Sequence, residues 1–242
     1  MLVIKLDAID STNDYLKALA KNEMLENYTT VIANKQTKGR GQMGAEWVAE
    51  EGKNLTVSIL VKDVLHHHQS IFTLNAAVAL AVVTVLDTLT IPKVCIKWPN
   101  DIMADTKKIG GILIENSIKH DGAISSIIGI GLNVNQTNFE NLPQATSIAI
   151  ATQKETDKEE LMEKMVRKLI EHVALIPSQS DLLWQRYHER LFKNGIPMPF
   201  ETNDGNQFMG IIQTVTEDGK LQLLLEDDSI STFGVKEIKM LY

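Results

Sequence analysis

Residues 35–47 of the chain read Lys-Gln-Thr-Lys-Gly-Arg-Gly-Gln-Met-Gly-Ala-Glu-Trp and set the framework for the rest of the sequence. Glycine lets a backbone approach a ligand closely, and successive N–H groups in such a loop attract anions. Arginine adds a rigid set of donors for phosphate or carboxylate, and tryptophan offers a flat face. The stretch predicts a loop that closes over a phosphorylated ligand. The alternative is a plain surface turn, because short glycine-rich strings are common.

Composition limits the classes of protein to consider. The 242 residues are 44% hydrophobic and carry a formal net charge of -7, which favours a well-cored globule and argues against a nucleic-acid partner. Cys95 is the only cysteine, so no internal disulfide can form, and we expect a cytoplasmic protein. Residues 70–89 are mostly apolar but include Asn75 and Asp87, which predicts a buried helix and no membrane span.

Apolar periodicity predicts a chain that mixes strands and helices. Strands are expected at residues 2–6, 30–33, 55–62, 94–98, 109–115 and 124–135. Helices are expected after residues 11–13, over 71–89, after the capping sequence 156–159, and from residue 180. Asp121-Gly122 is a hairpin signal, and residues 140–152 are expected to be irregular.

The C-terminal fifth of the chain has a different pattern. Gly195-Ile196-Pro197-Met198-Pro199 interrupts the helical spacing, and short strands are expected beyond it at 208–215, 220–225 and 229–234. This pattern predicts a small antiparallel barrel. We therefore expect two domains, 1–195 and 196–242, with the smaller one leaning on the larger because about 45 residues is near the lower limit for independent stability.

Several polar residues have both a structural and a functional interpretation. Residues 11–13, Ser-Thr-Asn, are good helix N-caps, but they also place hydroxyl and amide groups where a small polar ligand could bind. Asn100 and Asp101 follow Pro99 at the end of an expected strand, where functional residues often gather. The triplet 66–68, His-His-His, could be a metal site, but a solvated turn is favoured because no Asp, Glu or Cys joins it at ligand spacing.

Two expected strands contain paired glycines, at 110–111 and at 129 and 131. Glycine weakens a strand unless a ligand or another backbone approaches there. The second strand also contains Asn133, which could hydrogen-bond the edge of a ring. These positions therefore predict an open sheet face beside a binding site.

Taken together, four motifs occur in the order of one family. They are residues 11–13, residues 35–41, residues 97–101 with 107–113, and residues 129–133. The chain resembles a biotin–protein ligase (biotin–[acetyl-CoA-carboxylase] ligase) over its whole length. The resemblance implies an α+β fold, with a mixed, mostly antiparallel sheet packed against helices in the manner of class II synthetases, and a small C-terminal SH3-like β-barrel.

The resemblance also implies a reaction and its partners. ATP, with Mg²⁺ on its phosphates, would activate biotin as biotinyl-5′-AMP and release pyrophosphate. Biotin would then pass to a lysine of a biotin carboxyl carrier domain. Some members carry an N-terminal winged-helix repressor domain, for which the motif at Ser11 leaves no room, so we expect no operator binding. Both monomers and homodimers fit the sequence.

By the same resemblance, Lys108 and Arg40 are the expected catalytic residues. The residues expected to bind biotin are Ser11, Thr12, Asn13, Gln36, Gly39, Arg40, Gly41, Gln42, Lys108 and Gly111. The residues expected to bind ATP are Arg40, Trp47, Asp101, Lys108 and Asn133, and no protein metal ligand is assigned. Many relatives have arginine at the positions of Gln42 and Ala45, so Arg40 and Lys38 are expected to carry more of the phosphate load, or the adenylate to be held less tightly.

Two rival functions remain at this stage. A lipoate ligase or octanoyl transferase would share the fold and use a lysine near an acyl carboxyl, but would need a more apolar ligand slot. A non-catalytic biotin or nucleotide sensor would need no Lys108. The Gly-Arg-Gly loop and the terminal barrel favour biotin over the first rival, and Lys108 together with the expected absence of a DNA-binding segment weighs against the second.

Overall fold

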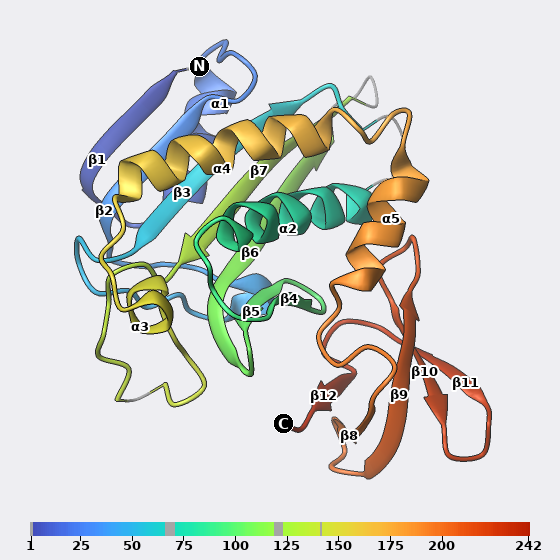
Figure 1. Cartoon of the computed structure of the whole chain (residues 1–242). Coiled ribbons are helices and arrows are strands. Elements are labelled where there is room, and N and C mark those ends of the chain that lie inside the picture. The colour runs from blue at the N-terminus through green and yellow to red at the C-terminus, as the bar shows by residue number, and fades with distance from the viewer. Residues whose placement is uncertain (1, 66–70, 119–122, 141) are drawn as a thin grey trace.

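The computed structural model describes residues 2–65, 71–118, 123–140 and 142–242, and Figure 1 shows its arrangement of two sheets and several helices. The His66–His68 triplet and the Asp121-Gly122 turn lie outside the described residues. Within the described residues, no helix is both long enough and apolar enough to cross a membrane.

The larger sheet has seven strands. They are β1 (Val3–Ile9), β2 (Thr30–Gln36), β3 (Leu55–Lys62), β4 (Val94–Lys97), β5 (Asp101–Ala104), β6 (Lys107–Ile118) and β7 (Ile124–Leu132). Their order is β1-β2-β3-β7-β6-β5-β4, with β1 and β2 parallel and every other neighbouring pair antiparallel. The expected mixed, mostly antiparallel sheet is confirmed. Strand β5 was not expected, because the segment after Pro99 carries too short an alternation.

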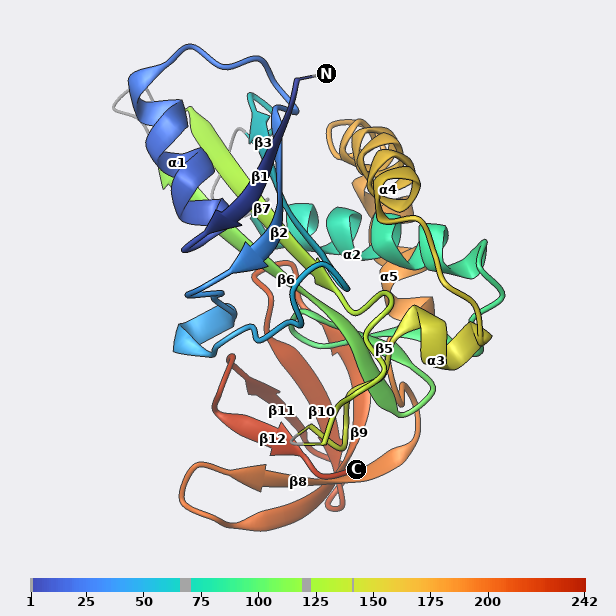
Figure 2. The same cartoon turned by 90° about the vertical axis from the view of Figure 1, so that its left-hand side faces the viewer.

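Helices cover this sheet on both faces, as Figure 2 shows. Helices α2 (Ile71–Asp87), α4 (Lys158–Val173) and α5 (Ser180–Glu189) pack on one side with the main core, and α1 (Thr12–Asn22) lies on the other. Alternation along β3 sets this division: Val57 and Ile59 join the main core, whereas Leu60 packs with Leu16 of α1. The face toward α1 is therefore free to carry polar groups and glycines.

Two helical segments differ from expectation. Helix α3 (Ile148–Thr152) lies within the segment that was expected to be irregular, and Ser147 caps it by accepting from the Ile150 N–H. Helix α4 is capped by Asp157 rather than Thr156, because the Asp157 carboxylate accepts from the N–H groups of Glu159 and Glu160. Sequence spacing located α4 but not its capping residue, and it did not predict α3.

The second sheet comprises β8 (Pro197–Thr202), β9 (Gln207–Val215), β10 (Leu221–Leu225), β11 (Ile230–Phe233) and β12 (Ile238–Met240), in the order β11-β10-β9-β8-β12. It is antiparallel throughout, as expected for an SH3-like barrel. The helical pattern ends before Pro197 and Pro199, and strand β8, which was not expected, begins at them; β8 tolerates both prolines because β12 pairs only with residues 200–202 beyond them. The indole N–H of Trp98 donates to the Gly219 carbonyl at 2.9 Å and joins this sheet to the larger one.

Packing between α4 and the sheet yields a stability prediction. Leu169 on α4 is fully buried in the main core, so Leu169→Ala should lower the free energy of unfolding by about 2–5 kcal/mol through lost contacts and a cavity. Glu163→Ala, at an exposed position of the same helix, should change it by less than about 0.5 kcal/mol. Equilibrium urea unfolding measures both, and equal losses in the two variants would contradict the packing described.

Candidate active site

The site is built on a row of four residues across the sheet, of which the middle two are glycines. Cross-strand register aligns Thr56, Gly131, Gly111 and Asp101 on β3, β7, β6 and β5. Side chains at these positions face α1, opposite the main core. The two glycines leave the centre of this face open, so a flat group can lie directly on the backbone. We call the pair Gly111 and Gly131 the glycine floor.

The loop after β2 folds over this floor. The Trp47 N–H donates to the Gly39 carbonyl at 3.0 Å, the Gly41 N–H donates to the Ala45 carbonyl at 2.6 Å, and the short 3-10 turn η1 (Gln42–Gly44) lies between them. A side chain at Gly39 would overlap the Trp47 carbonyl, which explains the glycine there. The stretch is thus not a plain surface turn, since it brings an aromatic ring onto the sheet.

The Trp47 indole lies on the glycine floor. A Cβ added to Gly131 would come within 2.5 Å of the indole ring, and one added to Gly111 would come within 3.7 Å. The indole Nε1 is buried and has no hydrogen-bond partner among the described residues. An unpaired buried donor costs about 1–3 kcal/mol, so this N–H is suited to a ligand acceptor.

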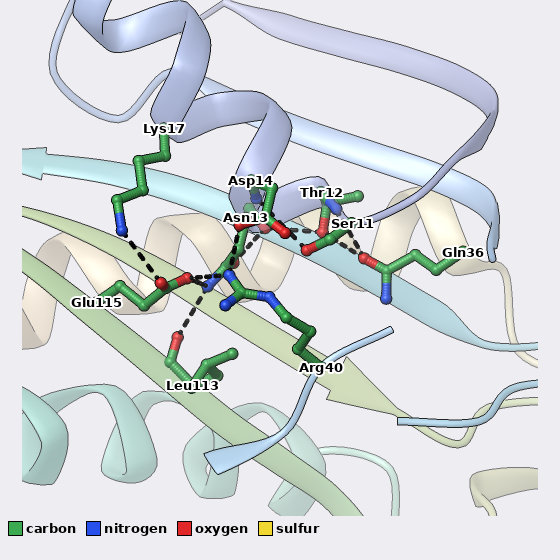
Figure 3. Close-up of polar contacts among 10 residues, drawn as sticks. Ser11, Thr12, Asn13, Asp14, Lys17, Gln36, Arg40, Leu113 and Glu115 are labelled. Carbon is green, nitrogen blue, oxygen red and sulfur yellow. Dashed lines mark hydrogen bonds and ion pairs between the residues drawn. The ribbon is translucent and has the colours of Figure 1, made fainter. Parts of the chain in front are cut away.

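A buried polar network lies beside the floor, and Figure 3 shows it. The backbone N–H and the hydroxyl of Thr12 donate to the Gln36 Oε1 at 2.8 and 2.9 Å, which leaves the Gln36 amide nitrogen free to donate to a ligand. Ser11 caps α1, with its Oγ accepting from the Asp14 N–H at 3.4 Å. The network therefore presents oriented donors and acceptors to the cavity.

Ser58 completes this network and was missed by sequence reasoning. Its hydroxyl lies 2.8 Å from the Thr12 Oγ1 and donates to the Asn13 Oδ1 at 2.6 Å, and it is fully buried. A Cβ at Gly129 would lie 2.5 Å from that same Asn13 oxygen, so glycine is required opposite Ser58. The available signal was a serine on the non-core face of β3.

A charged group lies at the other end of the floor. The Lys108 ammonium is 2.5 Å from the Asp101 carboxylate and 5.9 Å from the centre of the Trp47 ring. Lys97 is 3.9 Å from the same carboxylate. Burial lowers the pKa of Lys97, and the positive charge of Lys108 acts in the same direction. An anionic ligand would therefore offset the positive charges of both amines.

These groups surround one cavity of about 520 Å³. Its cationic lining residues are Arg40, Lys97, Lys108, Lys236 and Lys239, and its acidic ones are Glu46 and Asp101. An excess of positive charge inside a chain of net charge -7 indicates an anionic ligand. Sequence reasoning missed Lys236 and Lys239, because no motif marks them and they reach the cavity only through the fold of the second sheet.

Most of the expected site residues meet in this cavity. Its lining includes Ser11, Thr12, Asn13, Gln36, Arg40, Gly41, Gln42, Trp47, Asp101, Lys108 and Gly111. Gly39 lies outside the lining, against the backbone carbonyl of Trp47. Asn133, expected to bind ATP, is buried outside the lining: β7 ends before it, and its side chain donates to the Thr146 carbonyl at 3.0 Å. Lys38 also lies outside the lining, where it pairs with Asp10 at 2.8 Å.

A family model and several relatives match the chain. Residues 6–135 match the model of the biotin/lipoate A/B protein ligase family. The bifunctional ligase/repressor BirA of Bacillus subtilis strain 168 is 34% identical over 244 residues, which cover 96% of this chain and 70% of that protein. The biotin–[acetyl-CoA-carboxylase] ligase of Mycobacterium tuberculosis is 29% identical over 216 residues, which cover 88% of this chain and 79% of that protein.

A solved structure shares the fold over the whole chain. The biotin protein ligase from Aquifex aeolicus in complex with biotin and ATP superposes with a TM-score of 0.80 at 25% identity and covers 99% of this chain and 98% of that one. The chain thus has the same two-sheet architecture as that protein.

The glycine floor yields a prediction about Trp47. Gly131→Ala should displace the indole, because the new Cβ would lie 2.5 Å from it, whereas Gly111→Ala places its Cβ at an ordinary contact distance. Fluorine NMR of protein labelled with 5-fluorotryptophan, with the Trp47 signal assigned by Trp47→Phe, should show a large shift in the first variant and a smaller one in the second. An unchanged Trp47 signal in Gly131→Ala would contradict the placement of the ring.

Proposed function

The chain belongs to the biotin/lipoate A/B protein ligase family, and we propose that this ligase activates biotin with ATP and transfers it to a lysine of an acceptor protein. The observation that carries the proposal is the union, in one cavity, of the hydrogen-bonding network around Gln36 and the cations around Lys108. The first suits a neutral polar ring, and the second suits a carboxylate meeting a phosphate.

The hydrogen-bonding network is the proposed biotin end. A ureido ring has one carbonyl acceptor and two N–H donors, which Ser11, Thr12 and Gln36 can match. Unmatched buried polar groups cost about 1–3 kcal/mol each, so a purely apolar ring would leave this network unsatisfied. This argument favours biotin over the lipoate or octanoate alternative, which needs a more apolar slot.

The cationic group is the proposed ATP end. A biotin carboxylate and an α-phosphate repel each other, and fixed cations offset that repulsion most strongly where water is excluded. Lys108 is proposed to bridge the two, Arg40 to close over the adenylate, and Trp47 to lie near the nucleotide. Asn133 was expected to bind adenine; its amide nitrogen donates to the Thr146 carbonyl here, and its contact with the nucleotide stays a prediction.

Lys236 and Lys239 supply positive charge that the loop itself lacks. Gln42 and Ala45 stand where many relatives have arginine, and Lys38 is paired with Asp10 outside the cavity. The Lys236 ammonium instead donates to the Met43 carbonyl at 2.6 Å, within the same loop. We propose that these two lysines, more than Lys38, compensate for the missing guanidinium groups.

The proposed chemistry has two steps. A biotin carboxylate oxygen bonds to the α-phosphorus of ATP while the bond to the β-phosphate oxygen breaks, and pyrophosphate leaves. The acceptor amine then bonds to the acyl carbon, AMP leaves with the bonding electron pair, and the amine loses a proton. An acyl-adenylate is already activated, so the enzyme needs no nucleophile of its own and has chiefly to exclude water.

Mg²⁺ fits this site as a partner of the nucleotide. Among the described residues, no cluster of three His, Cys, Asp or Glu side chains could hold a metal ion. Mg²⁺ typically uses one or two carboxylates together with substrate phosphates, and Asp101 is the carboxylate at the cationic end of the cavity. Mg²⁺ there would offset phosphate charge, with Asp101 as its protein ligand.

The remaining partners follow from the same proposal. We propose a biotin carboxyl carrier domain as the acceptor; the name of the Mycobacterium tuberculosis relative gives acetyl-CoA carboxylase as the target of that protein. We propose that residues 1–195 and 196–242 act as two domains that share one site, because Lys236 and Lys239 line the cavity from the smaller one. The single cysteine supports a cytoplasmic location.

Exchange of labelled pyrophosphate into ATP tests the proposed function. Exchange should depend on biotin and should not be supported by lipoate at equal concentration. Exchange supported by lipoate would favour the alternative, and ATP-independent binding of biotin without exchange would indicate a sensor.

Lys108 yields the sharpest prediction of this mechanism. Lys108→Ala should lower biotin-dependent pyrophosphate release by at least about a hundredfold, because the cation that bridges two anions is lost. The far-UV circular dichroism spectrum and melting temperature should stay close to the parent, since the side chain is partly exposed. Lys107→Ala, at the exposed neighbouring position, is the matched control and should retain activity. Near-parent activity in Lys108→Ala would refute the assignment.

A further inference from the structure

Glu115 lies where three separate elements meet. Its side chain, on β6, is only 18% exposed. One carboxylate oxygen accepts from the Lys17 ammonium of α1 at 3.3 Å. The other accepts from the Asn13 amide at 3.0 Å and from the Arg40 guanidinium at 2.7 Å. Figure 3 shows these contacts converging on one side chain.

The contact with Asn13 fixes the direction of an amide in the polar network. Asn13 is 3% exposed, and its nitrogen donates to Glu115 while its oxygen accepts from Ser58. A carboxylate only accepts, so the nitrogen must face Glu115 and the oxygen must face Ser58. The same nitrogen also donates to the Leu113 carbonyl at the longer distance of 3.4 Å, so the carboxylate is the closer of two acceptors that orient the amide. Ser58 in turn contacts Thr12, which extends this orientation as far as the cavity.

The contact with Arg40 holds the loop. Arg40 uses the same nitrogen, Nη2, for Glu115 and for the Asp14 carboxylate at 2.6 Å. Among the described residues, this leaves Nε and Nη1 to donate to another acceptor. The loop arginine is thereby fixed beside the start of α1 without exhausting its donors.

Glu115 is charged in this setting. Burial alone would raise the pKa of its carboxyl, but the hydrogen bond from Asn13 and the charges of Arg40 and Lys17 outweigh burial and hold that pKa below its ordinary value. A charged carboxylate makes stronger hydrogen bonds than a neutral amide in the same place. Its replacement by glutamine therefore separates the effect of charge from the effect of shape.

We propose that Glu115 is a positioning residue that orients Asn13 for recognition of the neutral ring of biotin and anchors Arg40 so that the loop of residues 38–47 stays over the cavity. Glu115 acts through these two residues and does not itself contact the reacting atoms. This inference rests on the proposed function for its kinetic consequence, but the anchoring of the loop can be measured without any substrate.

Three variants separate the two roles. Glu115→Ala removes both contacts. Glu115→Gln can still accept from Asn13 but loses the charge that holds Arg40. Asp14→Asn weakens only the second partner of Arg40 and leaves the Asn13 contact intact. Each is compared with the parent for the KM of biotin and of ATP in pyrophosphate exchange, and for the rate of native tryptic cleavage after Arg40.

Glu115→Ala should raise the KM of biotin about tenfold, the effect of losing one hydrogen bond to a charged group, and the KM of ATP by a smaller factor through the loosened Arg40. Glu115→Gln and Asp14→Asn should change the KM of biotin by less than about threefold. All three should speed tryptic cleavage after Arg40, with Glu115→Ala the fastest. A purely structural role would instead raise both KM values by the same factor and lower the melting temperature.

Other outcomes overturn the inference. If Glu115→Ala leaves the KM of biotin unchanged, Glu115 does not orient the recognition network. If trypsin cleaves Glu115→Gln after Arg40 no faster than the parent, the Glu115 carboxylate does not anchor the loop. Absence of biotin-dependent exchange in the parent would refute the proposed function instead, while the cleavage rates would still test the anchoring of Arg40.

Discussion

The site depends on a sheet face that has no side chains at its centre. Gly111 and Gly131 pair across β6 and β7, and this gap lets the Trp47 ring rest directly on backbone. A β-carbon at Gly131 would occupy the space of that ring. The loop, the polar network and the cations all lie around this gap. Side chains alternate along the strands, so one face packs the main core and the other carries the binding surface.

Electrostatics explains why the cavity lies between two sheets. A chain of net charge -7 places Arg40, Lys97 and Lys108 on the first sheet and its loop, and Lys236 and Lys239 on the second, around one space. The pKa of Lys97 is lowered mainly by burial, and the neighbouring charges of Lys108 and Lys239 act in the same direction while Asp101 opposes them. An anionic ligand in this space would face cations from both sheets.

The sequence predicted the features that depend on local pattern. Alternation in residues 55–62, the apolar helix from residue 71 and the paired glycines were all found where expected. Features that depend on register or tertiary contact were missed. Ser58 joins the polar network only because the register places it opposite Gly129, and Glu115 gains its partners only when α1 and the loop approach β6. Lys239 reaches the cavity only through the fold of the second sheet. The role of Asn133 stays a prediction, and the structure shows its side chain donating to the Thr146 carbonyl just beyond the end of β7. The family motifs located the site, but the contacts that hold it together required the structure.

The most direct measurement is a crystal structure of the chain with a non-hydrolysable analogue of biotinyl-5′-AMP. The account predicts the ureido ring against Ser11 and Gln36, the acyl-phosphate linkage within hydrogen-bonding distance of the Lys108 ammonium, and the ligand lying over the glycine floor. An analogue bound elsewhere, or a Lys108 side chain directed away from the linkage, would contradict the account.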